Sequence, residues 1–516
     1  MALRFLLISL LLSLFQLGYG EEVKVSVKAV TSVATTDDTF VCATLDWWPS
    51  GKCNYGQCPW GQTSILNLDL TNPILAKAIK AFSPLRIRLG GSLQDQVLYK
   101  VGKVRRCPAF KNSTKGLFGF SKGCLKMERW DLVYDLLSKS GAKISFGLNA
   151  LFGRKRPTTG NTWAGPWNPS NARDFIQYIL SKGQNVDSWE FGNELCGSGI
   201  SARVDAKQYG EDMKVLKQVI DELYQNSSSK PKIMGPGGFF ETQWFKEFLE
   251  ASGPNVVDIV THHIYNLGAG VDPSVLSKIQ DPYYLFNTAN TYKDTAATLK
   301  DFAPWSSAWI GESGGAYNSG SKNVSHSFVD SFWYLDQFGM TSTFSHKVFC
   351  RQTLIGGNYG LLNTTTMVPN PDYYSALLWH RLMGKRVLGL THDGSPFLRS
   401  YCHCTRSKSG ITLLFINLSN TTDFTISVTE DMNLYPQSVD EVSSGKSLRE
   451  EYHLTPKDGD IQSTTMLLNG VPLELTESGD IPELKPALVN PRQPLIVAPY
   501  SIAFVSLPNF RAPACF

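Results

Sequence analysis

The stretch "WEFGNELCG", residues 189–197, is an apolar, aromatic run that ends in an acidic residue and a loop. We interpret it as a β-strand whose last residues are Asn193 and Glu194. Similar short runs recur between residues 40 and 355, and the stretch from 207 to 225 between two of them repeats apolar residues at helical spacing. Strands that alternate with helices form parallel sheets. The pattern predicts a (β/α)8 TIM barrel, with an open doubly wound sheet as the alternative.

The barrel prediction depends on eight strands. They are "FVCATLDWW" from residue 40, "LRIRLGG" from 85, "KISFGLNAL" from 143, "SWEFGNE" from 188, "KIMGPGG" from 232, "IVTHHIYN" from 259, "AWIGESGG" from 308 and "STFSHKVFCRQT" from 342. No glycine-rich dinucleotide fingerprint opens any of the intervening helices, which argues against the open sheet.

The two ends of the chain have a different pattern. From about residue 388, short alternating runs such as "GITLLFINLS" and "YSIAFVSLP" are separated by Gly, Asn, Pro and Asp, and "EEVKVSVKAVTSVAT" from residue 21 alternates in the same way. They predict an accessory antiparallel β-sandwich domain built from both chain ends. The expected division is a signal peptide at 1–20, an N-terminal strand of the sandwich at 21–39, the catalytic barrel at 40–387 and the C-terminal sandwich at 388–516.

The first twenty residues place one Arg before an apolar run and end with small residues, as a signal peptide does. A signal anchor is the alternative, but the run is short for a membrane span. We therefore expect a soluble secreted glycoprotein of the extracellular space or cell wall, or of a vacuole or lysosome-like compartment, with no transmembrane segment and at most peripheral membrane association. Six glycosylation sequons begin at Asn112, Asn226, Asn323, Asn363, Asn417 and Asn420.

The ten cysteines of the 516 residues fit an oxidising compartment. The expected disulfides are Cys53 with Cys58, Cys107 with Cys124, and Cys404, or alternatively Cys402, with Cys515. A zinc site at "CNYGQC" or "CHC" is less favoured because neither has a second ligand pair at finger-like spacing. The net charge of +4 is spread along the chain, so no nucleic-acid partner is indicated.

Two glutamates end predicted strands, where barrel enzymes place their active sites. Glu194 ends the fourth strand and Glu312, in "WIGESGG", lies near the end of the seventh. Two facing carboxyl groups suit cleavage of a glycosidic bond, because one protonates the leaving oxygen and the other attacks or stabilises the sugar carbon. Glu190 is on the same face of its strand as Glu194 but four residues deeper, where a paired structural carboxylate is expected.

Five motifs give the chain a specific resemblance: "WEFGNE", "THHIYNLG", "WIGESGGAYNSG", "CRQTLIGGNYGLL" and "NPDYYSALLWHRLMG". Together they resemble the heparanase-like β-glucuronidases of glycoside hydrolase family 79, most closely the plant members, over nearly the whole mature chain. The resemblance implies a retaining mechanism with Glu194 as acid/base and Glu312 as nucleophile. It implies neither a metal nor a cofactor.

The same resemblance implies substrate contacts. Asn193 is expected to bind the sugar near its 2-hydroxyl, and Tyr265 with His262 and His263 is expected to line the site beside the nucleophile. For both histidines a buried structural role is the alternative. The motifs carry no dedicated Arg for a substrate carboxylate, and neutral donors are expected to bind it instead: Tyr317, Asn318, Ser319 and Tyr359.

Departures from the animal heparanases narrow the expected substrate. "AGVDP" after "HHIYNLG" lacks their Arg, and "GPGGFFETQW" has Gly and Phe where they have Gln and Arg. The segment between residues 95 and 130 is also short, so a single chain is expected. The predicted substrates are unsulfated β-glucuronides, such as glucuronic acid or its 4-O-methyl form on arabinogalactan, or flavonoid glucuronides. The alternatives are an inactive glycan-binding protein on this scaffold and a barrel glycosidase for a neutral sugar.

Overall fold

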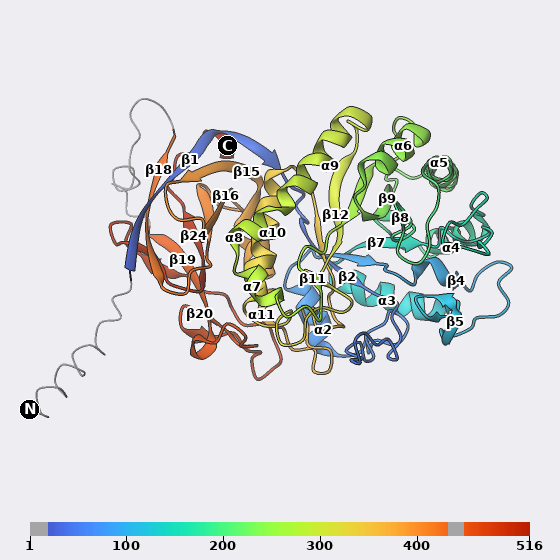
Figure 1. Ribbon diagram of the computed structural model, residues 1–516, viewed down its shortest axis with the longest axis horizontal. Coiled ribbons are helices and arrows are strands. Elements are labelled where there is room, and N and C mark those ends of the chain that lie inside the picture. Colours follow the sequence, from blue (N-terminus) through green and yellow to red (C-terminus); the bar gives the residue numbers. More distant parts are fainter. Residues whose placement is uncertain (1–18, 432–447) are drawn as a thin grey trace, which may run out of the picture.

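The computed structural model describes residues 19–431 and 448–516. The predicted signal peptide lies outside the described residues except for its last two, which begin the first strand, β1 (Tyr19–Thr35). Figure 1 shows two parts side by side, a barrel surrounded by helices and a second, larger sheet that contains β1.

The barrel is a closed ring of eight parallel strands that follow one another around it in chain order. All eight predicted strands are present, so the predicted (β/α)8 barrel is confirmed. They are β2 (Val41–Leu45), β3 (Arg86–Leu89), β7 (Lys143–Leu148), β8 (Ser188–Phe191), β9 (Lys232–Phe239), β10 (Ile259–His263), β12 (Ser307–Ser313) and β14 (Phe349–Arg351).

Strand β8 ends earlier than expected. It stops at Phe191 instead of continuing through Asn193 and Glu194. Gly192 has φ 75° and Glu194 has φ 55°, and these left-handed conformations turn the backbone out of the strand. The acidic residue therefore lies in a tight turn just beyond the strand.

Helices surround the barrel (Figure 1). Helix α5, for example, is capped by the Asp205 side chain and buries Met213, Leu216 and Ile220, in agreement with the apolar spacing of its sequence. The helices are α2 (Pro73–Lys80), α3 (Met127–Lys139), α4 (Ser170–Ser181), α5 (Ala206–Leu223), α6 (Thr242–Ser252), α7 (Val275–Ile279), α8 (Pro282–Phe286), α9 (Thr288–Phe302), α10 (Asp330–Thr343) and α11 (Pro371–Leu382).

The second sheet combines both ends of the chain, as predicted. Its inner face packs on α10 and α11, and on its other side Val25, Phe415 and Val505 belong to a separate apolar core. The strands are β1, β15 (Met383–His392), β16 (Leu398–Thr405), β17 (Ile411–Asn417), β18 (Thr422–Glu430), β19 (Arg449–Pro456), β20 (Met466–Leu468), β21 (Val471–Pro472), β22 (Ala487–Val489), β23 (Leu495–Val497) and β24 (Ser501–Leu507).

Two details of this sheet differ from expectation. The sheet is not purely antiparallel, because β1 runs parallel to β18; these strands come from opposite ends of the chain and no hairpin constrains their direction. In addition, α11 leads directly into β15 at Met383, so the sheet begins before the expected boundary at residue 388.

Short strands outside both sheets position the loops at one end of the barrel. β11 (Gly268–Ala269) pairs with β13 (Ala316–Tyr317) and so ties the loop after β10 to the loop after β12. On another side, β4 (Val97–Tyr99) pairs with β6 (Gly123–Leu125), and β5 (Asn112–Leu117) precedes β6.

Four disulfides are formed among residues 19–431 and 448–516. Cys53–Cys58, Cys107–Cys124 and Cys404–Cys515 match the prediction, and Cys402 is a free, buried thiol. The fourth, Cys42–Cys350, was not predicted. It joins the neighbouring strands β2 and β14, which lie 308 residues apart in the sequence, so only closure of the barrel brings them together.

The sequons differ in exposure. The five at Asn112, Asn226, Asn323, Asn363 and Asn420 are exposed. Asn417 is completely buried in β17, and its amide nitrogen donates to three backbone carbonyls. A glycan on Asn417 is incompatible with this packing, so Asn417 is corrected as a glycosylation candidate and its sequon is a chance match. Within residues 19–431 and 448–516, no helix is long and apolar enough to cross a membrane.

Candidate active site

A cavity of about 320 Å³ opens at the carboxyl ends of the barrel strands. Both predicted catalytic glutamates line it, together with Tyr265 and Tyr359. Its remaining walls are formed by Trp48, Lys52, Asn54, Trp60, Ser92, Phe118, Ile200, Phe239, Tyr317, Asn318, Ser319 and Gln352. The cavity therefore contains most of the residues that the sequence assigned to the site.

Glu194 is held at the cavity wall by the turn after β8. Its backbone N–H donates to the carbonyl of Gly237, 2.7 Å away, and its side chain is almost fully buried. Burial raises the pKa of Glu194 to about 7, although the Arg88 guanidinium acts in the opposite direction. A carboxyl with such a pKa holds its proton near neutral pH and suits a general acid.

Glu312 has a different environment at the end of β12. Its Oε2 accepts a hydrogen bond of 2.8 Å from Arg88 Nη1, and its Oε1 accepts one of 2.6 Å from the Tyr265 hydroxyl. Both donors stabilise negative charge on the carboxylate. Glu312 therefore has the surroundings of a nucleophile, in contrast to those of Glu194.

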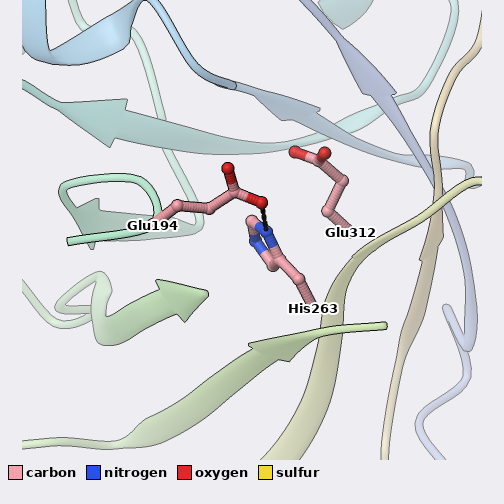
Figure 2. A group of neighbouring side chains, drawn as sticks. All are labelled: Glu194, His263 and Glu312. Atoms are coloured by element: carbon pink, nitrogen blue, oxygen red, sulfur yellow. Dashed lines mark hydrogen bonds and ion pairs between the residues drawn. The ribbon is translucent and has the colours of Figure 1, made fainter. Parts of the chain in front are cut away.

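Figure 2 shows Glu194, from the turn after β8, and Glu312, from β12, with their carboxyl groups directed toward a common space beside His263. One ligand atom from each of the three side chains lies within 4.8 Å of the others. Such a set could also bind a divalent cation, but its members are the two candidate catalytic carboxyls and the histidine that contacts one of them. The short gap between the carboxyls fits an acid and a nucleophile that act on one bond.

The two neighbouring histidines have separate roles. His263 Nδ1 lies 3.1 Å from Glu194 Oε1, and burial lowers the pKa of His263 to about 4. His262, which we expected in the site, points the other way: its Nε2 lies 2.9 Å from Nε2 of His346 and its ring packs near Tyr292. Adjacent residues of a strand face opposite sides, so His262 points away from the cavity and has a structural role. The prediction that His262 contacts the substrate is therefore wrong.

Arg88 of β3 connects the site and was not predicted. Its three guanidinium nitrogens donate to Glu190 Oε2 at 2.6 Å, Glu312 Oε2 at 2.8 Å and Asn193 Oδ1 at 2.8 Å. Glu190 is thus the paired structural carboxylate that its depth in the strand suggested. Arg88, the second arginine of "LRIRLGG", was the available signal, because a cation in an apolar strand requires an acidic partner.

Asn193 has both donors of its side-chain NH2 group left over. Its Oδ1 is held by Arg88 and its backbone N–H donates to Asp95 Oδ2 at 2.8 Å, but its buried side-chain nitrogen has no partner among the described residues. An unpaired buried donor is costly unless a ligand accepts from it.

Asp46, at the end of β2, is a second buried acid that sequence reasoning missed. Its Oδ2 accepts from the Gln352 side chain at 3.0 Å, and Gln352 itself lines the cavity. Burial, reinforced by the nearby Glu312, raises the pKa of Asp46 to about 7. Its place after the first barrel strand follows the rule that identified Glu194, so the same pattern could have revealed it.

The loop after β13 forms one wall of the cavity. Asn318, Ser319 and Gly320 have consecutive positive φ angles of 59°, 78° and 77°. The Ser319 hydroxyl is already engaged, since it accepts from Trp60 Nε1 at 2.9 Å and donates to Asn54 Oδ1 at 3.0 Å. Among the described residues, none accepts from the backbone N–H of Asn318 or Ser319, so both donors remain for a ligand.

Solved structures with low sequence identity share the fold. The GH51 arabinofuranosidase from Xanthomonas axonopodis pv. citri superposes with a TM-score of 0.65 at 14% identity, over 94% of this chain and 99% of the other. The 4-O-α-L-rhamnosyl-β-D-glucuronidase from Fusarium oxysporum gives a TM-score of 0.64 at 13% identity, over 94% and 100%. At these identities the likeness establishes the fold alone.

Curated relatives are much closer in sequence. The chain is 54% identical to heparanase-like protein 1 of Arabidopsis thaliana, over 95% of this chain and 94% of the relative. It is 40% identical to baicalin-beta-D-glucuronidase of Scutellaria baicalensis, over 95% and 93%. Residues 22–339 match the model of the glycosyl hydrolase family 79 N-terminal domain. The chain therefore belongs to glycosyl hydrolase family 79.

Proposed function

We propose that this protein is a retaining β-glucuronidase that removes β-linked glucuronic acid, or its 4-O-methyl form, from glycans such as arabinogalactan or from small-molecule glucuronides. The observation that carries the proposal is the pairing of a buried Glu194 with a hydrogen-bonded Glu312 across a gap within 4.8 Å. The relatives named for glucuronidase activity, one from Scutellaria and a hyaluronoglucuronidase from Hirudo nipponia at 30% identity, support the same substrate class.

In the first step of the proposed reaction, a carboxylate oxygen of Glu312 attacks the anomeric carbon. The bond to the leaving oxygen breaks, and that oxygen takes the proton of Glu194. In the second step, Glu194 as a carboxylate removes a proton from water, the water oxygen attacks the anomeric carbon, and Glu312 is released. Two displacements restore the β configuration.

The hydrogen bonds of Glu312 suit this sequence. Arg88 and the Tyr265 hydroxyl stabilise its charge before attack, and that charge is lost when the covalent bond forms. Arg88 then keeps its bond to Glu190, so the guanidinium is not left unpaired in the interior. The same donors are in place to stabilise the carboxylate as it leaves in the second step.

Substrate recognition is proposed to use the free donors of the site. The unpaired Asn193 side-chain nitrogen suits the sugar 2-hydroxyl, where hydrogen bonds strengthen in the transition state. The backbone N–H groups of Asn318 and Ser319, with the hydroxyls of Tyr317 and Tyr359, suit the carboxylate. Tyr359 is almost fully buried against Trp60, with the ring centroids 6.1 Å apart, so its hydroxyl has a fixed position.

The proposed site of action is outside the cell or within the secretory system. Four disulfides among the described residues fit an oxidising compartment, and five exposed sequons are open to glycosylation.

Hydrolysis of an aryl β-glucuronide by the wild type and by Glu312→Gln tests the function. We expect turnover only by the wild type, with the β-anomer as the first product seen by NMR. A first-formed α-anomer would refute retention, and equal rates would refute the nucleophile. Binding without turnover would indicate a glycan-binding protein, and preference for an aryl xyloside or galactoside would indicate a neutral-sugar glycosidase.

A further inference from the structure

Lys52 is the one cation among the residues that line the cavity in the described part of the chain. It lies just before the loop closed by Cys53–Cys58, and its Nζ is 4.2 Å from the centroid of the Trp48 ring. The acidic side chains of this cavity are Glu194 and Glu312, with Asp46 behind them. A positive charge in this cavity wall affects whether a charged substrate can bind.

The Lys52 ammonium has donors to spare. Burial lowers the pKa of Lys52, and the charge of Asp46 opposes that effect. No described side chain accepts a hydrogen bond from the Lys52 ammonium. A lysine ammonium carries three donors and no acceptor. When such a group is partly withdrawn from water without an acceptor, a bound anion stabilises it strongly.

The loop that follows Lys52 contacts the loop proposed to bind the substrate carboxylate. Asn54 and Trp60 both hydrogen-bond Ser319, and Asn318 donates to the Tyr55 hydroxyl at 2.8 Å. The disulfide-closed loop and the loop after β13 thus form one continuous wall. Lys52 is therefore on the side of the cavity where the carboxylate is expected.

Arg88 cannot replace Lys52 in this role. Its three nitrogens already donate to Glu190, Glu312 and Asn193, and it is completely buried beneath the cavity. The single positive charge of Arg88 is thereby more than offset by the two glutamates. Among the described residues that line the cavity, Lys52 is therefore the cation whose hydrogen-bond donors remain free.

We propose that Lys52 is a specificity-determining residue that forms an ion pair with the carboxylate of the β-glucuronide and so selects uronides over neutral sugars. It supplements the neutral donors of the loop after β13. The inference rests on the proposed glucuronidase function and adds the residue that reads the charge of the substrate. A purely structural Lys52 would only cover the Trp48 ring.

The test compares four full-length proteins: the wild type, Lys52→Met, Lys52→Arg and the control Lys246→Met. Methionine keeps an apolar stem on Trp48 while removing the charge. Lys246 is a matched control because its Nζ also lies over an aromatic ring, 5.5 Å from the Phe302 centroid, yet it does not line the cavity. The probes are 4-nitrophenyl β-D-glucuronide and its uncharged methyl ester, with the binding of the ester also measured as competitive inhibition.

For Lys52→Met, loss of a charge-assisted hydrogen bond is expected to lower kcat/KM on the glucuronide by about 10- to 100-fold, mainly through KM. Turnover of the methyl ester by Lys52→Met, and its inhibition constant, should stay near the wild-type values. Lys52→Arg should recover most of the activity on the glucuronide, and Lys246→Met should match the wild type on both probes. Equal losses on both probes, or no loss on either, would overturn the role of Lys52. If the wild type itself does not favour the glucuronide over its ester, the proposed glucuronidase function fails and the Lys52 inference falls with it.

Discussion

Replacing Glu194 with Gln removes the ionisable group whose burial defines the acid side of the site. The pKa of Glu194 is raised from its ordinary value of 4.5 to about 7. Because one pKa unit corresponds to about 1.36 kcal/mol, the fold disfavours the ionised carboxylate by about 3 kcal/mol. The stability associated with the neutral form is complete below about pH 4.5 and is lost as the pH rises through about 7.

The Glu194→Gln variant does not lose this stability as the pH rises, because glutamine does not ionise. Relative to the wild type, its free energy of unfolding is therefore expected to increase between pH 4.5 and pH 8 by about 3 kcal/mol. Urea denaturation of both proteins across this range measures the difference. The comparison between variant and wild type cancels the contributions of the other buried groups, including the histidines, whose lowered pKa values act with the opposite sign. Glu250→Gln, at an exposed position of α6, is the matched control.

Kinetics give a second measure of the same residue. Without its acid, Glu194→Gln should lose about 100- to 10,000-fold in rate on glucuronides with poor leaving groups. The loss in the first step should be much smaller for 4-nitrophenol, which departs without a proton, and added azide should then speed release of the sugar. A stability difference that does not vary with pH, or equal losses on good and poor leaving groups, would refute the assignment of Glu194 as the proton donor.

Three further predictions concern the contacts of the site and the exposure of the sequons. Arg88→Lys cannot keep all three hydrogen bonds and should lower the free energy of unfolding by about 3–5 kcal/mol, measured by urea denaturation, together with kcat/KM. His263→Phe should shift the alkaline limb of the pH profile of kcat/KM to higher pH, because the ionised Glu194 loses a polar neighbour. His262→Phe should leave that limb in place and reduce only the free energy of unfolding. Peptide mapping after enzymatic deglycosylation should find modification at exposed Asn420 and none at buried Asn417.

The barrel was predictable because its strands are local patterns. Each buried strand of a parallel barrel is a short apolar run bounded by loops. Seven of the runs begin and end within a few residues of the observed strands, whereas the eighth was expected from residue 342, which lies in α10, and β14 begins only at Phe349. The end of β8 was missed because Gly192 and Glu194 adopt left-handed conformations, and a sequence of apolar and small residues does not reveal where the backbone turns. The parallel pairing of β1 with β18 was missed because nothing local fixes the direction of strands from opposite chain ends.

The site was predictable only where one residue carried its own signal. Glu194 lies in the turn just after β8 and Glu312 lies near the end of β12, so the barrel rule located both. Arg88 could not be placed in the same way, because its role consists of contacts to residues on three other segments. His262 and His263 show the limit of a motif: the sequence identified the pair, but only the orientation of β10 determined which ring enters the site.

The charges of the site explain why a β-glucuronidase needs a cation that the family motifs do not show. Arg88 is paired with two carboxylates, Glu190 and Glu312, which leaves that cluster with an excess negative charge. Glu194 and Asp46, each with a pKa raised to about 7, add no charge while they are protonated. A substrate carboxylate entering a cavity with one excess negative charge would be repelled, and the repulsion would be strong in a partly dehydrated space. In the proposed site, Lys52 cancels that excess before the substrate arrives, so a glucuronide can bind beside Glu312, the proposed nucleophile, which must itself remain negative.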